Sequence, residues 1–185
     1  PSPLNSEAHQ GDLSAVLLQN LNPLVNLIRV PKKPIILMDE WESKIKAIVE
    51  NTWNKDVNSL SGVPSWMLVL IKAVLKKTGR EYLTDVWPNL EVFFHGGISF
   101  EPYREQYKTL IPSNKMHYME TYNASEGFFG LQDDPTDSSL LMMPDYGIFY
   151  EFIPMNEVGN AHPTVLPLES VETGKNYAMV ITTSG

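Results

Sequence analysis

Apolar and polar residues follow a helical period in the first half of the chain. From residue 39 to about residue 52, apolar side chains recur every three or four positions opposite charged ones, which predicts an amphipathic helix. These apolar side chains are Trp41, Ile45, Ile48 and Val49. Residues 65–77 predict a second helix, ended by a Thr-Gly pair after lysines in its last turn. Weaker patterns predict short helices over residues 11–19 and 101–109, and Pro31-Lys32-Lys33-Pro34 predicts a loop.

Short apolar runs bounded by glycine and proline predict the strands. They are residues 57–61, 90–95, 115–122, 140–143, 147–153 and 176–183. Helices and strands alternate over residues 11–130, residues 131–185 are rich in strands, and the polar residues 1–10 are expected to be loose. The pattern therefore predicts an α/β fold in which a mixed β-sheet is flanked by helices, with a β-rich C-terminal portion. We expect one domain, or a fragment of a larger one.

Charge and composition narrow the classes of function. The net charge of −8 argues against an extended nucleic-acid surface, although backbone amides and one metal ion can still hold a single nucleotide. No apolar run reaches the length of a membrane helix, so we expect no membrane partner. The chain has no cysteine and no signal-peptide pattern, and we expect a cytoplasmic protein. It starts without methionine and stops in an apolar strand, from which we expect a piece of a longer protein.

Two strand-to-loop junctions carry residues suited to ligand binding, because ligands collect beyond the carboxyl ends of strands in open α/β sheets. After the strand that ends at His95, Gly96 and Gly97 would let a flat ring or a phosphate approach the backbone. A tight turn alone would also use two glycines. We predict that strands 90–95 and 115–122 are neighbours in one sheet, so that both junctions meet at one edge.

The second junction is Tyr122-Asn123-Ala124-Ser125-Glu126. It offers an aromatic ring, a hydroxyl and a carboxylate, which can stack on a base, bond a phosphate oxygen and hold Mg²⁺. A solvated loop is the alternative interpretation.

Together the junctions resemble the adenylate-forming superfamily, in which a Gly-Gly loop lines the adenine and a Tyr-Gly-x-Thr-Glu motif contacts phosphate and metal. Asn123 stands here in place of Gly, and Ser125 in place of Thr. Four blocks in order resemble, more narrowly, the auxin-responsive Gretchen Hagen acyl-acid amido synthetases, in a form similar to bacterial relatives. The blocks are Trp87–Leu90, Gly96–Tyr103, Ser125–Gly130 and Tyr146–Pro154.

This resemblance implies part of the large N-terminal domain of an ATP-dependent ligase. ATP would activate a small carboxylic acid as an acyl-adenylate, and an amino acid would then displace AMP, with Mg²⁺ as the metal. The residues carried over to the nucleotide are Gly96, Gly97, Tyr122, Asn123, Ser125 and Glu126. Ser125 and Glu126 are the catalytic candidates among them, because Ser125 would bond the α-phosphate and Glu126 would hold the metal.

The acid substrate is assigned less directly. Phe128, Phe129 and Tyr150 would lie toward the acyl pocket, or they are ordinary core aromatics. Two further parts of the family are not found: nothing in residues 1–60 resembles the Ser/Thr/Gly-rich phosphate loop, and an Arg-Tyr…Gly-Asp segment is expected after residue 185. We therefore expect the isolated chain to be inactive. A non-catalytic module that binds a nucleotide or small acid, and a regulatory domain for a protein partner, are the alternatives.

Overall fold

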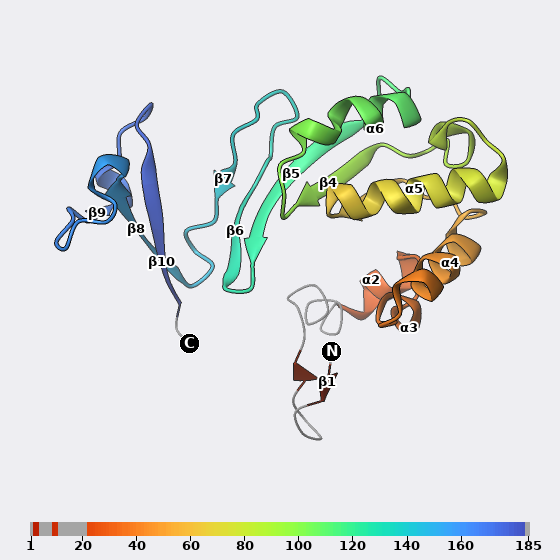
Figure 1. Ribbon diagram of the computed structural model, residues 1–185, viewed down its shortest axis with the longest axis horizontal. Coiled ribbons are helices and arrows are strands. Elements are labelled where there is room, and N and C mark those ends of the chain that lie inside the picture. The colour runs from red at the N-terminus through yellow and green to blue at the C-terminus, as the bar shows by residue number, and fades with distance from the viewer. Residues whose placement is uncertain (1, 4–8, 11–21, 184–185) are drawn as a thin grey trace.

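A mixed five-stranded sheet forms the centre of the computed structural model, which describes residues 2–3, 9–10 and 22–183 (Figure 1). The strand order is β3-β4-β5-β6-β7; the first three strands run parallel, and β6 and β7 are antiparallel to their neighbours. The bounds are β3 (Ser59–Gly62), β4 (Val92–Gly96), β5 (His117–Ala124), β6 (Gly127–Leu131) and β7 (Leu141–Met142). The predicted α/β fold with a mixed sheet is confirmed.

Helices α5 and α6 cover one face of this sheet, and α4 packs against α5 (Figure 1). The helices are α2 (Pro23–Ile28), α3 (Lys33–Ile36), α4 (Trp41–Thr52), α5 (Pro64–Thr78) and α6 (Arg104–Leu110). Local sequence sets the ends of α5, because Pro64 occupies its first position and Gly79 closes it at φ 65°. Among the described residues no helix is long and apolar enough to cross a membrane.

The main core lies between these helices and the sheet. The largest fully buried side chains include Ile71 of α5, Phe93 of β4 and Tyr107 of α6. Two buried polar atoms fix the core to helix ends: Trp87 Nε1 donates to Thr52 O at 3.1 Å, and Tyr107 Oη donates to Pro64 O at 2.8 Å. Buried donors that find carbonyl partners avoid the cost of desolvation, so these bonds fix the end of α4 to the segment before β4, and the start of α5 to α6.

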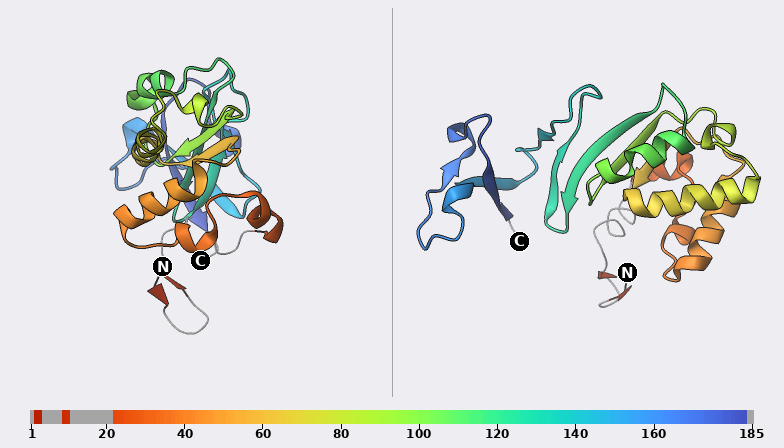
Figure 2. Two further views of the ribbon diagram at one scale, coloured as in Figure 1. Left: turned by 90° about the vertical axis from the view of Figure 1, so that its right-hand side faces the viewer. Right: turned by 45° about the horizontal axis from the view of Figure 1, so that its top comes forward.

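A second sheet follows in the chain, with the order β10-β8-β9 (Figure 2). Its strands are β8 (Ile148–Pro154), β9 (Leu166–Pro167) and β10 (Tyr177–Thr183), all antiparallel. Phe129 of β6 is buried together with Ile148 and Tyr150 of β8, and Met179 and Ile181 of β10 pack against them. The β-rich C-terminal portion therefore packs against the β5–β6 hairpin through this apolar cluster.

The structure corrects three predictions of local structure. The expected loop at Pro31–Pro34 runs into α3, because proline fits the first turn of a helix. The expected helix at 101–109 begins as a 3₁₀ turn (Glu101–Tyr103) and becomes α-helical only at Arg104. Residues 1–10, expected to be loose, include β1 (Ser2–Pro3) paired with β2 (His9–Gln10). The helix predicted over residues 11–19 lies outside the described residues.

Candidate functional site

The two predicted junctions lie at one edge of the central sheet. Strands β4 and β5 are parallel neighbours, as predicted, and Gly96 pairs with Thr121 at the end of the shared ladder. From Thr121 the chain needs five residues to reach Glu126, a reach of at most about 17 Å. The glycine loop and the segment that leads to Glu126 therefore begin at the carboxyl ends of adjacent strands.

Glycine is favoured at positions 96 and 97 for two different structural reasons. A Cβ atom added to Gly96 would lie 2.3 Å from Thr121 O, so this glycine is required by the close approach of β5. Gly97 is exposed and has φ 82°, in the left-handed region that favours glycine, with Val63 Cγ2 as its nearest neighbour at 3.5 Å. Gly97 is thus the more exposed of the two, and Gly96 sets the spacing of the strands behind it; contact of either glycine with a nucleotide stays a prediction.

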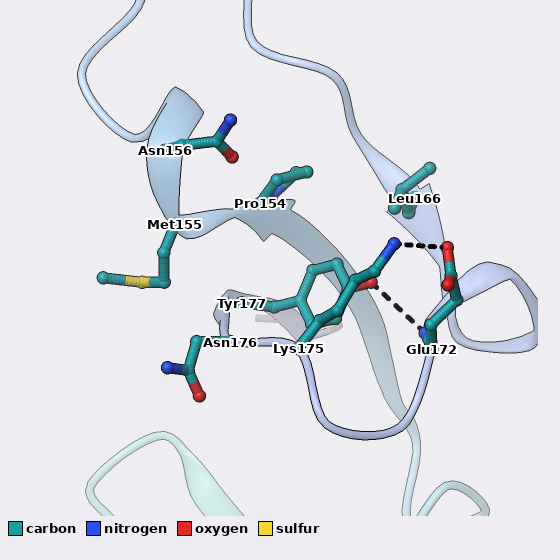
Figure 3. A pocket seen from close by; sticks show the side chains of 8 residues that line it. All are labelled: Pro154, Met155, Asn156, Leu166, Glu172, Lys175, Asn176 and Tyr177. Atoms are coloured by element: carbon teal, nitrogen blue, oxygen red, sulfur yellow. Dashed lines mark hydrogen bonds and ion pairs between the residues drawn. The ribbon is translucent and has the colours of Figure 1, made fainter.

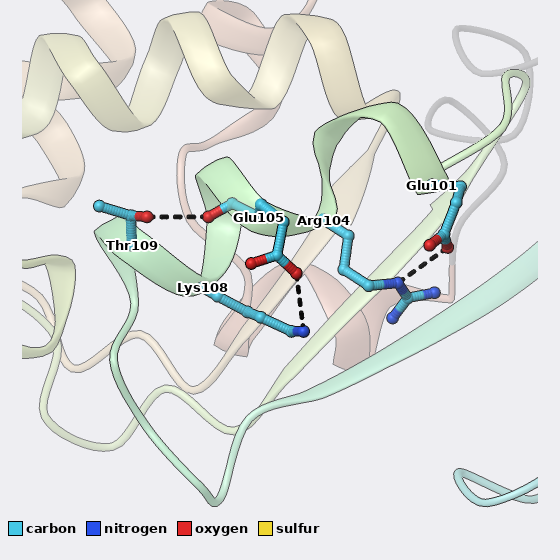
Figure 4. A network of polar contacts seen from close by, with 5 residues as sticks. All are labelled: Glu101, Arg104, Glu105, Lys108 and Thr109. Atoms are coloured by element: carbon cyan, nitrogen blue, oxygen red, sulfur yellow. Dashed lines mark hydrogen bonds and ion pairs between the residues drawn. The ribbon is translucent and has the colours of Figure 1, made fainter.

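Aromatic stacking fixes both ends of the glycine loop. His95 is 3% exposed, and its ring stacks on Phe100 with centroids 4.3 Å apart. The guanidinium of Arg104 lies over the ring of Phe100, 5.0 Å from its centroid. Its Nε donates to a carboxylate oxygen of Glu101 at 2.9 Å (Figure 4). Residues 97–99 are exposed between these anchors. The loop is consequently short, open to solvent and held at both ends.

His95 is held in its neutral form. Burial, and to a smaller extent the positive charge of Arg104, lowers the pKa of the His95 imidazole to about 4. Within the described part of the chain, His95 Nδ1 has no hydrogen-bond partner. Protonation would therefore place an unpaired charge inside the aromatic cluster.

We expect acid to destabilise the protein through His95. The imidazole of His95 has a pKa of 6.5 in the unfolded chain and about 4 in the folded protein. The contribution of His95 to the stability of the fold is therefore fully present above pH 6.5, and it is lost as the pH falls from 6.5 toward 4. The difference corresponds to roughly 3 kcal/mol in the free energy of unfolding. His95→Phe keeps a stacking ring that cannot titrate, and should flatten this part of the pH profile in urea unfolding. His117→Gln replaces an exposed histidine of β5 and serves as the control. Equal slopes for wild type and His95→Phe would contradict the assignment.

The second junction is a hairpin, which corrects the expected strand-to-loop junction. Strand β5 continues to Ala124, Ser125 and Glu126 form a two-residue turn, and β6 returns from Gly127. The register shifts between Tyr122 and Asn123, a bulge that re-aims the tip of the hairpin. The apolar segment Gly127–Leu131 forms the return strand because its buried face packs on the second sheet.

The predicted ligand-binding groups of this hairpin are largely exposed. Ser125 and Glu126 are exposed, and Tyr122 is 47% exposed with its ring 5.1 Å from that of Phe129. Asn123 is half-buried opposite Phe128. The hairpin therefore presents an aromatic face, a hydroxyl and a carboxylate from three nearby positions.

The donor set suits a metal that arrives with a nucleotide. Among the described residues no three His, Asp or Glu side chains are grouped closely enough to hold an ion alone. Mg²⁺ commonly keeps several waters and takes one or two carboxylates plus substrate phosphates. A single exposed carboxylate at Glu126 fits that mode of binding, and does not fit a permanent all-protein metal site.

The three aromatics predicted for the acyl pocket differ in burial. Phe129 and Tyr150 are 3% and 5% exposed and form the centre of the second core cluster. Phe128 is half-buried, with its ring 6.3 Å from that of Tyr146. Their contact with an acid substrate stays a prediction, and packing accounts for the burial of Phe129 and Tyr150.

A cavity of about 430 Å³ lies in the second sheet region, apart from the predicted site residues (Figure 3). Pro154, Leu166 and the ring of Tyr177 form its apolar walls. Its two charged side chains pair with each other, since Lys175 Nζ lies 2.7 Å from Glu172 Oε1, and the hydroxyl of Tyr177 accepts from the backbone N of Glu172. These polar groups are satisfied within the protein and do not call for a ligand.

Comparison with known proteins gives consistent matches. The model described as the GH3 family N-terminal domain matches residues 2–116, and the model described as the GH3 family central domain matches residues 141–185. The hairpin with Ser125 and Glu126 lies between these ranges. Indole-3-acetic acid-amido synthetase GH3.8 of Oryza sativa subsp. indica is 35% identical over 112 residues, which cover 55% of this chain and 18% of the rice protein. Synthetase GH3.4 of Arabidopsis thaliana is 28% identical over 154 residues, covering 77% and 24%.

Solved structures agree in fold. The GH3.15 acyl acid amido synthetase superposes with a TM-score of 0.66 at 16% identity, over 91% of this chain and 38% of the other. A second structure, AtGH3.15 in complex with 2,4-DB, gives 0.52 at 17% identity, over 75% and 32%. The chain spans about a fifth of the length of the curated relatives it matches.

Proposed function

This chain belongs to the GH3 family, and on that premise we propose that it is the part of an ATP-dependent acid–amino-acid ligase that holds the nucleotide. In the proposed reaction a carboxylic acid attacks the α-phosphate of ATP, pyrophosphate leaves, and the amine of an amino acid then displaces AMP to form an amide. The relatives named above are amido synthetases, which supports this class of reaction. Because ATP is the proposed substrate, we also propose a cytoplasmic location.

One observation carries the proposal: the pairing of Gly96 with Thr121 brings the glycine loop and the hairpin to one sheet edge. An adenine ring could lie on Gly97 and stack against the exposed face of Tyr122. In this arrangement the phosphates would extend toward the hydroxyl of Ser125 and the carboxylate of Glu126.

The roles proposed for Ser125 and Glu126 follow from the position where negative charge develops during adenylation. As pyrophosphate departs, negative charge moves toward the leaving group, and donors aimed in advance at that position lower the barrier. Ser125 would donate its hydroxyl proton in a hydrogen bond to an α-phosphate oxygen, and Glu126 would bind Mg²⁺ together with the phosphates. Mg²⁺ bound there would offset the phosphate charge. Asn123, at the bulge, would orient the tip of the hairpin.

The acid substrate is proposed by class. Relatives bear names that specify indole-3-acetic acid, and one solved relative contains 2,4-DB. We propose a small carboxylic acid whose apolar body lies toward Phe128, the least buried of the three predicted pocket aromatics.

Acid-dependent exchange of radiolabelled pyrophosphate into ATP tests the proposal. The full-length protein should catalyse this exchange with indole-3-acetic acid or a related acid, because exchange reports acyl-adenylate formation directly. The 185-residue chain alone should show none, since nothing in residues 1–60 resembles a phosphate loop. ATP binding by the full-length protein without exchange under any acid would contradict the ligase and support a binding module. Exchange by the isolated chain would contradict the need for further segments.

A further inference from the structure

Thr121 connects the two halves of the candidate site. We propose that Thr121 is a positioning residue, which fixes the distance between the glycine loop and the Ser125–Glu126 hairpin. It does not touch the reacting atoms in this account. The role in catalysis rests on the proposed function, whereas the mechanical connection rests on contacts of the chain itself.

Contacts on the β4 side come from both the side chain and the backbone of Thr121. Its Oγ1 donates to His95 O at 3.1 Å, so the last carbonyl before the glycines is held by a side chain of the neighbouring strand. Its backbone O is the atom that a Cβ on Gly96 would meet at 2.3 Å. The strands are therefore in close contact at the point where the glycine loop leaves the sheet.

On the side of β6, Thr121 is connected to the hairpin that carries Ser125 and Glu126. Thr121 pairs with Gly96 of β4 and with Leu131 of β6, so three strands are in register at this one residue. The register shift between Tyr122 and Asn123 follows at once. Thr121 is thus one residue from the start of the bulge that aims Ser125 and Glu126, and any displacement of Thr121 moves the tip of the hairpin relative to Gly97.

The hydroxyl is the part of Thr121 that can be removed without changing its shape. Thr121→Val keeps the branched volume and deletes the donor, which leaves His95 O with one hydrogen bond fewer. Small misplacements of groups that hold a substrate cost large factors in rate, up to about a hundredfold for 1 Å. Thr121→Ser restores the donor and should recover the behaviour of wild type.

The experiment measures amide hydrogen exchange of residues 96–100 and 122–127 in the full-length protein, together with the KM for ATP in pyrophosphate exchange. In Thr121→Val we expect both segments to exchange about fivefold faster and the KM for ATP to rise about fivefold. Thr121→Ser should lie close to wild type in both readouts. A loss of folded protein alone would reduce the apparent kcat without moving the KM.

Thr109→Val is the matched control, because Thr109 Oγ1 donates to Glu105 O at 2.9 Å on the exposed side of α6 (Figure 4). It should leave both segments and the KM unchanged. Unchanged hydrogen exchange in Thr121→Val, or a response in only one of the two segments, would overturn the proposal. If the wild-type protein lacked acid-dependent activity, the proposed ligase would fail, while hydrogen exchange would still decide whether Thr121 couples the loop to the hairpin.

Discussion

Gly96→Ala should destabilise the protein by about 3 kcal/mol or more, enough to prevent folding of a marginally stable domain. The added methyl group would lie 2.3 Å from Thr121 O and 3.3 Å from its carbonyl carbon. Both atoms belong to the backbone of a central strand, so no side-chain rotation can relieve the contact. Strands β4 and β5 would have to separate where the candidate site begins. Urea unfolding with circular dichroism measures the loss.

Two other glycines serve as controls for this substitution. Gly97 and Gly174 both have positive φ, 82° and 79°, but a Cβ on Gly97 meets only Val63 Cγ2 at 3.5 Å, and a Cβ on Gly174 meets nothing within 4 Å. Alanine at either position should cost only about 1 kcal/mol of backbone strain. If Gly96→Ala were as stable as these two variants, the close approach of β4 and β5 would be wrong.

Glu126→Gln in the full-length protein should reduce adenylation about a hundredfold. Glutamine keeps the volume of the side chain but removes the negative charge that would hold Mg²⁺ at the proposed site as charge develops on the leaving group. Losing one preorganised electrostatic contact of this kind costs roughly 3 kcal/mol in the transition state. Thermal stability should change little, because Glu126 is exposed at a turn. Pyrophosphate exchange at saturating acid measures the rate of adenylation, and the melting temperature of the same variant measures its thermal stability.

Glu120 on the same strand is the control for charge removal. It is half-buried, pairs with His95 in the β4–β5 ladder, and lies before the hairpin tip. Glu120→Gln should therefore have the milder effect on exchange. Near-normal exchange in Glu126→Gln would remove Glu126 from the site. A large fall that is accompanied by a lower melting temperature would make Glu126 a structural residue instead.

Features with local causes could be predicted from the sequence. The ends of α5 depend on Pro64 and Gly79, which act on their own neighbours. The helix over Trp41–Thr52 follows from its apolar period. The pairing of β4 with β5 also follows from the sequence, because two apolar runs that each end in candidate ligand-binding residues favour a shared sheet edge.

Features with long-range causes could not be predicted. The return strand Gly127–Leu131 is stabilised by packing on β8 and β10, which lie up to about fifty residues later in the sequence. The close approach that requires glycine at position 96 involves a carbonyl on another strand, which no local pattern in the sequence shows; contact of Gly96 with a nucleotide stays a prediction. The neutral state of His95 depends on Phe100 and Arg104, which approach it only in the folded chain.

A crystal structure of the full-length protein with an ATP analogue and Mn²⁺ tests most directly whether the loop and the hairpin form one nucleotide site. Anomalous scattering places the metal without ambiguity. We predict a Mn²⁺ peak about 2.1 Å from a carboxylate oxygen of Glu126, with the adenine against Gly97 and the ring of Tyr122. A nucleotide bound elsewhere, or a metal held by other carboxylates with Glu126 free in solvent, would contradict the account.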